Sequence, residues 1–126
     1  MRRARLAAIL LAVVCAAGLG ACGHTARVPA RGVLYLTLQE YRLAPDSARV
    51  HAGQLTIHVR NLGRLTHNLA VTDGTRTIAS THPIPPGYAT WFELWLTPGT
   101  YQISSSLFSD QDFGLYGTLT VTHAKK

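Results

Sequence analysis

Apolar and polar residues alternate with a period of two through most of the chain between residues 33 and 123. In the stretch QLTIHVRN (54–61), leucine, isoleucine and valine occupy every second position. Such alternation is typical of β-strands that bury one face, whereas an amphipathic helix repeats its apolar residues every three or four positions. Because no part of this region shows the helical pattern, we predict an all-β domain.

Glycine and proline divide this region into short segments, at AP (44–45), DG (73–74), IPPG (84–87) and TPG (97–99). Regularly spaced short strands with such turns are typical of antiparallel Greek-key sandwiches and barrels. We therefore predict one antiparallel Greek-key β-sandwich or barrel of about seven to eight strands over residues 32–126. The expected strands are 33–43, 54–61, 67–71, 75–80, 88–96, 100–108 and 118–123.

The N-terminal residues follow a different pattern. A basic start, MRRAR, precedes an unbroken apolar run (6–17), which is too short to span a membrane comfortably. The following LGAC (19–22) resembles the lipobox of bacterial lipoproteins, in which small residues come just before a cysteine. This resemblance implies a signal peptide over 1–21, acyl chains such as palmitate on Cys22, and a tether over 22–31. An ordinary secretory signal cut nearby is the alternative.

These features predict a protein held at the extracytoplasmic face of the bacterial cell membrane. The membrane would be contacted through the N-terminal lipid, and a cell-envelope protein is a candidate partner. Of the 12 basic residues, three lie within 1–21, so processing would leave nine against six acidic residues. The remaining arginines are scattered rather than arranged in a stripe, which excludes nucleic acid as a partner.

Little in the chain indicates catalysis. The predicted processing would remove Cys15 and acylate Cys22, the two cysteines of the chain. The absence of a free thiol excludes thiolate nucleophiles and sulfur-ligated sites for soft metals. The sequence also shows no Asp–His–Ser arrangement and no glycine-rich nucleophile turn. We therefore predict that the protein is not an enzyme.

Three stretches together resemble the cupredoxin family, the fold of plastocyanin-type and azurin-type proteins. They are VHAGQLTIHVRNLGRLTHNLAV (50–71), IPPGYATWFELWLTPGTYQI (84–103) and GLYGTLTV (114–121). The resemblance covers nearly the whole domain and implies a cupredoxin-like sandwich. It also implies where a type 1 copper site would lie, which requires two histidines, one cysteine thiolate and a weak axial methionine.

The resemblance assigns one residue of this chain to each ligand position. His67 matches the first histidine, whereas the cysteine position falls on Ser105 and the methionine position on Leu115. The second histidine falls on Asp110, or on Asp112 if the loop length differs. One of four ligands is therefore present, which implies a degenerate type 1 site and excludes blue-copper electron transfer.

Two interpretations of His67 follow. In the first, it is a buried histidine whose hydrogen bonds are made to the backbone or to Ser105, and no cofactor is bound. The resemblance implies that Asn68 then joins this loop to its neighbour through side-chain hydrogen bonds. In the second, His67 belongs to a Cu(II) or Zn(II) site, because imidazoles and carboxylates suit these ions. The candidate ligands are His67, His82, Asp110 and Asp112.

A further group lies on the predicted strand 88–96. Trp91, Glu93 and Trp95 share one face of this strand, opposite its phenylalanine and leucine residues. Exposed, the two tryptophans would form an aromatic platform for a partner protein, a glycan or the membrane interface. Alternatively, they pack beneath the segment 73–83 or beneath the tether.

Together, these observations predict a lipid-anchored, extracytoplasmic, cupredoxin-like binding or accessory domain without a type 1 copper electron-transfer site. The alternative is a protein that binds or handles Cu(II) or Zn(II) through His67, with Asp110 and His82.

Overall fold

A computed structural model describes residues 25–29, 31–107 and 110–124. The predicted signal peptide and Cys22 lie outside these residues. Within the described ranges, no helix is long and apolar enough to cross a membrane. The described chain is instead built from strands, as the period-two alternation predicts.

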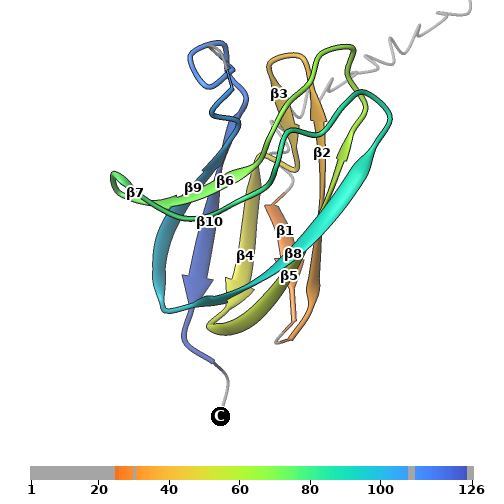
Figure 1. Cartoon of the computed structure of the whole chain (residues 1–126). Coiled ribbons are helices and arrows are strands. Elements are labelled where there is room, and N and C mark those ends of the chain that lie inside the picture. The colour runs from red at the N-terminus through yellow and green to blue at the C-terminus, as the bar shows by residue number, and fades with distance from the viewer. Residues whose placement is uncertain (1–24, 30, 108–109, 125–126) are drawn as a thin grey trace, which may run out of the picture.

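In the described part of the chain, ten strands form two sheets that pack face to face (Figure 1). The six-stranded sheet has the order β1-β4-β10-β9-β6-β7, and the four-stranded sheet has the order β3-β2-β5-β8. The strands are β1 (Thr25–Val28), β2 (Val33–Gln39), β3 (Arg42–Ala44), β4 (Ser47–His51), β5 (Gly53–Asn61), β6 (Ala70–Asp73), β7 (Arg76–Ser80), β8 (Ala89–Leu96), β9 (Gly99–Ser104) and β10 (Tyr116–Thr122).

The alternating residues meet between the two sheets. In β5, Leu55, Ile57 and Val59 are at most 2% exposed, while the residues between them point outward. The same alternation turns the odd-numbered residues 91, 93 and 95 of β8 to the outer face and Leu96 to the core. The core is continuous through both sheets, so the all-β sandwich predicted from the sequence is confirmed.

The pairing of the strands differs from the antiparallel prediction, because both sheets are mixed. β1 pairs with β4, β4 with β10 and β2 with β5 in parallel, while the remaining neighbours are antiparallel. The chain passes from one sheet to the other between β3 and β4 and returns before β5. Strands that become neighbours through such a crossing are not joined by a hairpin, and they can run in the same direction.

Three elements were not predicted. The stretch 33–43 is two strands, β2 and β3, joined by a tight turn in which Tyr41 has φ 60°. Strand β4 follows within a stretch where no strand was expected. Strand β1 lies inside 22–31, the stretch expected to be a tether, and pairs with the edge of the six-stranded sheet.

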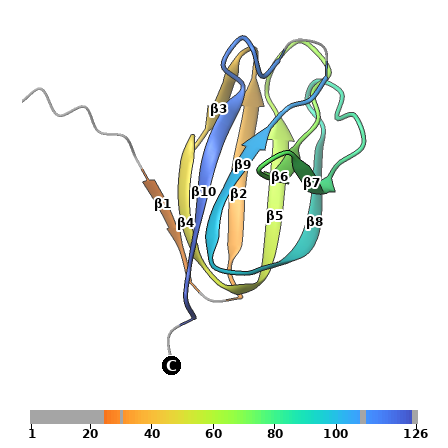
Figure 2. The same ribbon diagram turned by 90° about the vertical axis from the view of Figure 1, so that its left-hand side faces the viewer.

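The loops that join β2 to β3, β5 to β6 and β9 to β10 lie at one end of the sandwich (Figure 2). His67, expected to begin a strand, instead precedes β6 and forms an isolated antiparallel bridge with Ile84. The two residues exchange backbone hydrogen bonds of 3.2 and 2.7 Å. This bridge fixes the backbone of His67 and directs its side chain into the loop end.

Candidate functional site

His67 is the centre of the loop end. Its side chain is 0% exposed, and its Nδ1 lies 2.7 Å from Oδ2 of Asp110. Asp110 is itself only 5% exposed. A carboxylate can only accept a hydrogen bond, so Nδ1 carries the hydrogen that it donates to Asp110. The result is a buried, charge-assisted contact between two loops that are 43 residues apart in sequence.

Ser105 contacts the same oxygen of Asp110. Its Oγ donates to Oδ2 over 2.6 Å, so one carboxylate oxygen accepts from both His67 and Ser105. The resemblance assigned His67 and Ser105 to two ligands of one metal ion. In this structure a carboxylate oxygen, and no sulfur atom, lies between them.

Asn68 joins the β5–β6 loop to the β9–β10 loop. Its Oδ1 accepts from the backbone nitrogen of Ser106 over 2.8 Å, and its Nδ2 donates to the Ser106 hydroxyl over 2.9 Å. Its own backbone nitrogen donates to Oγ of Ser105. These contacts are the side-chain links between neighbouring loops that the resemblance implies for Asn68.

The other ring nitrogen of His67 faces Glu40, in the turn between β2 and β3. Nε2 is buried and has no hydrogen-bond partner among the described residues, and Oε1 of Glu40 lies 3.5 Å from it. The same Oε1 accepts from the backbone nitrogens of Leu65 and Arg64. The hydrogen bond from Leu65, followed by that from Arg64, holds the pKa of Glu40 below its ordinary value.

Glu40 was not among the predicted site residues. Its region was interpreted as one continuous strand, and only the turn between β2 and β3 brings Glu40 to the loop end. Gly63 makes room for it, because a Cβ atom at this position would overlap the Glu40 carboxylate. Asn61, 0% exposed, was also missed, and it donates to the carbonyls of Leu65 and Ile84 over 2.7 and 2.8 Å. The glycine in NLG (61–63) was the only sequence signal for either residue.

The lowered pKa of Glu40 predicts how stability depends on pH. A carboxyl group with a lowered folded pKa stabilises the protein above its unfolded pKa, and this contribution is lost as pH falls through the folded value. We expect Glu40→Gln to unfold at a lower urea concentration than the wild type at neutral pH. The difference should shrink below the ordinary pKa of 4.5. Urea unfolding across this pH range measures it, with the exposed Asp112→Asn as a control, and a difference that does not vary with pH would contradict the assignment.

Leu115, which the resemblance assigned to the position of the axial methionine, is 0% exposed. Its backbone nitrogen donates to the carbonyl of Asp110 over 2.9 Å, and its carbonyl accepts from Ser105 over 3.2 Å. Backbone hydrogen bonds within the β9–β10 loop therefore close it. The hydrocarbon side chain of Leu115 occupies the position that the resemblance gives to the fourth ligand.

Of the four candidate metal ligands, the structure brings two together. His67 and Asp110 are in contact, whereas His82 and Asp112 are exposed at the surface. Among the described residues, no group of three or more His, Cys, Asp or Glu side chains is arranged to hold a metal ion.

Comparison of the backbone with solved structures places this arrangement in a known fold. The chain is similar to a reduced auracyanin from Roseiflexus castenholzii, with 18% identity and a TM-score of 0.66 over 71% of this chain and 96% of auracyanin. It is also similar to rusticyanin from Thiobacillus ferrooxidans (14% identity, TM-score 0.61, 76% and 82% covered). A purple cupredoxin from Nitrosopumilus maritimus matches with 17% identity and a TM-score of 0.53, over 71% of this chain and 99% of that protein.

The chain has a cupredoxin-like fold. No protein-family model matches it, and no curated protein matches it. At identities this low the structural similarity establishes the fold, and the chemistry of the loop end has to be argued from this chain's own residues.

The outer face of β8 is the second candidate region of this cupredoxin-like domain. Trp91 is 58% exposed and Trp95 is 74% exposed, and Glu93 between them is also exposed. The alternative interpretation, in which the segment 73–83 or the tether covers the tryptophans, is therefore wrong. The alternation placed the three residues on one face correctly, but it could not show whether another segment lay over that face.

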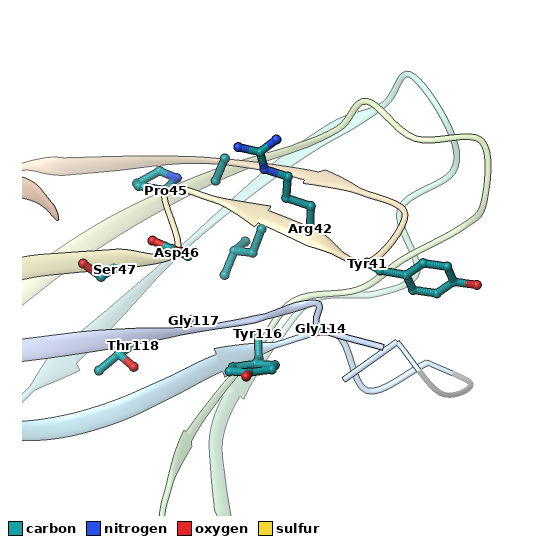
Figure 3. A pocket seen from close by; sticks show the side chains of 11 residues that line it. Tyr41, Arg42, Pro45, Asp46, Ser47, Gly114, Tyr116, Gly117 and Thr118 are labelled. Atoms are coloured by element: carbon teal, nitrogen blue, oxygen red, sulfur yellow. The ribbon is translucent and has the colours of Figure 1, made fainter. Parts of the chain in front are cut away.

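A groove of about 570 Å³ lies between β3, the turn that follows it, and β10 (Figure 3). The side chains of Tyr41 and Arg42 extend away from it. Gly117 lies so close to the other wall that a Cβ atom would come within 2.5 Å of the Asp46 carbonyl oxygen. The same carbonyl accepts from Thr118 over 2.9 Å. Gly117 therefore allows β10 to pack closely against the β3–β4 turn. The groove adds no residue to the site around His67.

Proposed function

We propose that this protein is a lipid-anchored, extracytoplasmic binding or accessory domain that is not an enzyme and holds no type 1 copper. The observation that carries the proposal is the position of Asp110. One oxygen of its carboxylate accepts hydrogen bonds from both His67 and Ser105. The resemblance assigns these two residues to positions that would ligate one copper ion.

The donor set does not fit type 1 copper. Such a site depends on a thiolate and a thioether, and this chain offers the hydroxyl of Ser105 and the hydrocarbon of Leu115 instead. The sulfur-bearing residues of the sequence, Met1, Cys15 and Cys22, all precede β1. Electron transfer through a cupredoxin copper centre is therefore no part of the proposal.

Asp110 provides a different way to close the loop end. A buried imidazole and a buried carboxylate are each costly to remove from water, but their direct contact and the hydroxyl of Ser105 offset that cost. The Asn68 side chain then joins the two loops that carry these residues. The end of the sandwich is held by the chain's own polar groups, so a bound ion is not needed to order it.

The alternative function is Cu(II) or Zn(II) handling through His67 with Asp110. The unpartnered Nε2 of His67 favours it, because a buried nitrogen without a hydrogen-bond partner is available as a ligand, and Glu40 offers a carboxylate on the same side. Asp110 would then orient the imidazole through Nδ1. The exposed His82 would have to move to take part.

Metal titration distinguishes the two functions. Calorimetry with CuCl2 and with ZnCl2 on the full-length protein in detergent should show no saturable binding that depends on His67. The dependence is tested by repeating the titrations on His67→Ala. Asp110→Asn, which keeps the size of the side chain, is the second variant, in case His67→Ala does not fold. Saturable binding that either substitution removes would establish the alternative and overturn the metal-free proposal.

Lipid anchoring is tested at Cys22. In cells fed an alkyne analogue of palmitate, the wild-type protein is expected to carry the label and to sediment with membranes. Cys22→Ser should lose the label and leave the membrane fraction, because stable anchoring requires acyl chains. Cys15→Ser is the matched control and should keep the label. Absence of label from the wild type would favour an ordinary secretory signal.

A further inference from the structure

A row of aromatic rings crosses the outer face of the four-stranded sheet. Tyr35 on β2, His58 on β5 and Trp91 on β8 are consecutive cross-strand neighbours. The ring centroids are 5.3 Å apart between Tyr35 and His58 and 6.4 Å apart between His58 and Trp91. Tyr35 is 68% exposed. Trp95 lies further along β8, so this outer face presents ring surface to solvent over three strands.

Glu93 lies between the two tryptophans and is held in place. Gln54 donates to its Oε2 over 3.0 Å, and the Thr56 hydroxyl donates to its Oε1 over 3.4 Å. Both donors are neutral, and no Lys, Arg or His of the described chain forms an ion pair with Glu93. After the proposed processing, nine basic residues remain against six acidic ones. In this mildly basic domain the oriented carboxylate of Glu93 is a negative charge without an ion-pair partner, between two aromatic rings.

β8 is also the edge of its sheet. It pairs with β5 on one side, and in the described part of the chain no strand pairs with its other side. It has eight residues and contains neither proline nor lysine, the residues that commonly protect an exposed edge. The other sheet has β7 as the edge strand at the corresponding end of its order. A groove of about 300 Å³ separates residues 88–92 from the segment 80–85.

We infer that the edge of β8 binds an extended segment of a partner polypeptide, which adds as a further strand and places a lysine or arginine opposite Glu93. This inference rests on the proposed binding function and names its partner. Free backbone groups of an edge strand supply the pairing, and alternate side chains supply the selectivity. A basic side chain next to Glu93 forms a cross-strand ion pair, and its cation can lie over the face of Trp91 or Trp95.

Charge also argues against other occupants of this face. Two copies of β8 could pair antiparallel with Trp91 of one copy opposite Trp95 of the other, which keeps both tryptophans on the outer face. Glu93 would then lie opposite Glu93 of the second copy, and like charges in that position are destabilising. Anionic lipid would be repelled by the same carboxylate. A glycan could stack on the tryptophans, but it would not use the unpaired backbone of β8.

Tryptophan fluorescence provides the test, because the chain has two tryptophans and both lie on this face. The probe is a blocked synthetic peptide of alternating valine and threonine with one central arginine, titrated into the full-length protein in detergent. It should shift the emission to shorter wavelength and bind at least about fivefold more tightly than the same peptide with glutamate in place of arginine. Glu93→Gln should abolish this preference, and Trp95→Ser should weaken binding at least about tenfold.

The control variant is Tyr116→Ser, which removes an exposed aromatic ring from β10 in the other sheet and should leave peptide binding unchanged. The inference is overturned if the arginine peptide causes no shift, or if the two peptides bind equally to the wild type. It is also overturned if cellohexaose gives a saturable shift that Trp95→Ser removes and Glu93→Gln does not. None of these results bears on metal binding, so the inference can fail while the metal-free proposal stands.

Discussion

A variant that combines Ser105→Cys, Asp110→His and Leu115→Met is expected to bind Cu(II) and to develop the intense visible absorption of a copper–thiolate bond. Together with His67, the three substitutions supply the two imidazoles, the thiolate and the thioether that a type 1 site requires. The geometry favours the change, because the side chains of His67 and Ser105 already point to one atom, at 2.7 and 2.6 Å. Absorption and electron paramagnetic resonance spectra after addition of CuSO4 provide the measurement.

The matched control is the same triple variant with His67→Ala, which should lose the visible band. The wild type with CuSO4 should also remain colourless. A triple variant that is folded, as shown by circular dichroism, and still gives no band would contradict the assignment of Ser105, Asp110 and Leu115 to the three ligand positions.

Asp110→Ala is expected to be the most destabilising single substitution at the loop end. It leaves Nδ1 of the buried His67 without an acceptor and leaves the Ser105 hydroxyl only Oδ1 of Asn68, 3.1 Å away. A buried donor without a partner typically costs about 1–3 kcal/mol. Urea unfolding followed by circular dichroism measures the loss. Asp112→Ala, two residues away on the exposed part of the same loop, should change the free energy of unfolding by less than about 0.5 kcal/mol.

The comparison of these two aspartates decides whether the contact stabilises the protein. Equal effects of Asp110→Ala and Asp112→Ala would show that the network at the loop end contributes little. A double-mutant cycle with Ser105→Ala then separates the hydroxyl's share, because the two side chains touch and their effects should not be additive.

The sandwich could be predicted from the sequence because burial on one face imposes a period of two, as in β5, where every second residue is buried. The parallel pairs could not be predicted in this way, because a period of two shows to which face a side chain points but does not indicate which strand pairs with which. β4 was missed for a related reason. It follows directly from the Ala44–Pro45 turn, and its pairing partners, β1 and β10, are remote in sequence.

At the loop end, too, one part could be predicted from the sequence and another could not. The burial of His67 and the joining role of Asn68 follow from their place in the HN pair and its resemblance to cupredoxins. The resemblance also brought His67 and Asp110 to one end of the sandwich, but their direct hydrogen bond, between residues 43 apart in sequence, is seen only in the folded chain. Glu40 contributes through a turn and two backbone hydrogen bonds from Arg64 and Leu65, none of which leaves a residue pattern.

If the protein is exported as proposed, the Asp110 contact also bears on how the domain matures in the cell envelope. A loop end closed by groups of the same chain forms in the same cooperative step as the sandwich, whereas one closed by an ion waits for that ion to be delivered. We expect a chelator such as EDTA to leave the thermal unfolding temperature unchanged. A domain built in this way would reach its final state in a copper-starved envelope as readily as in a copper-rich one.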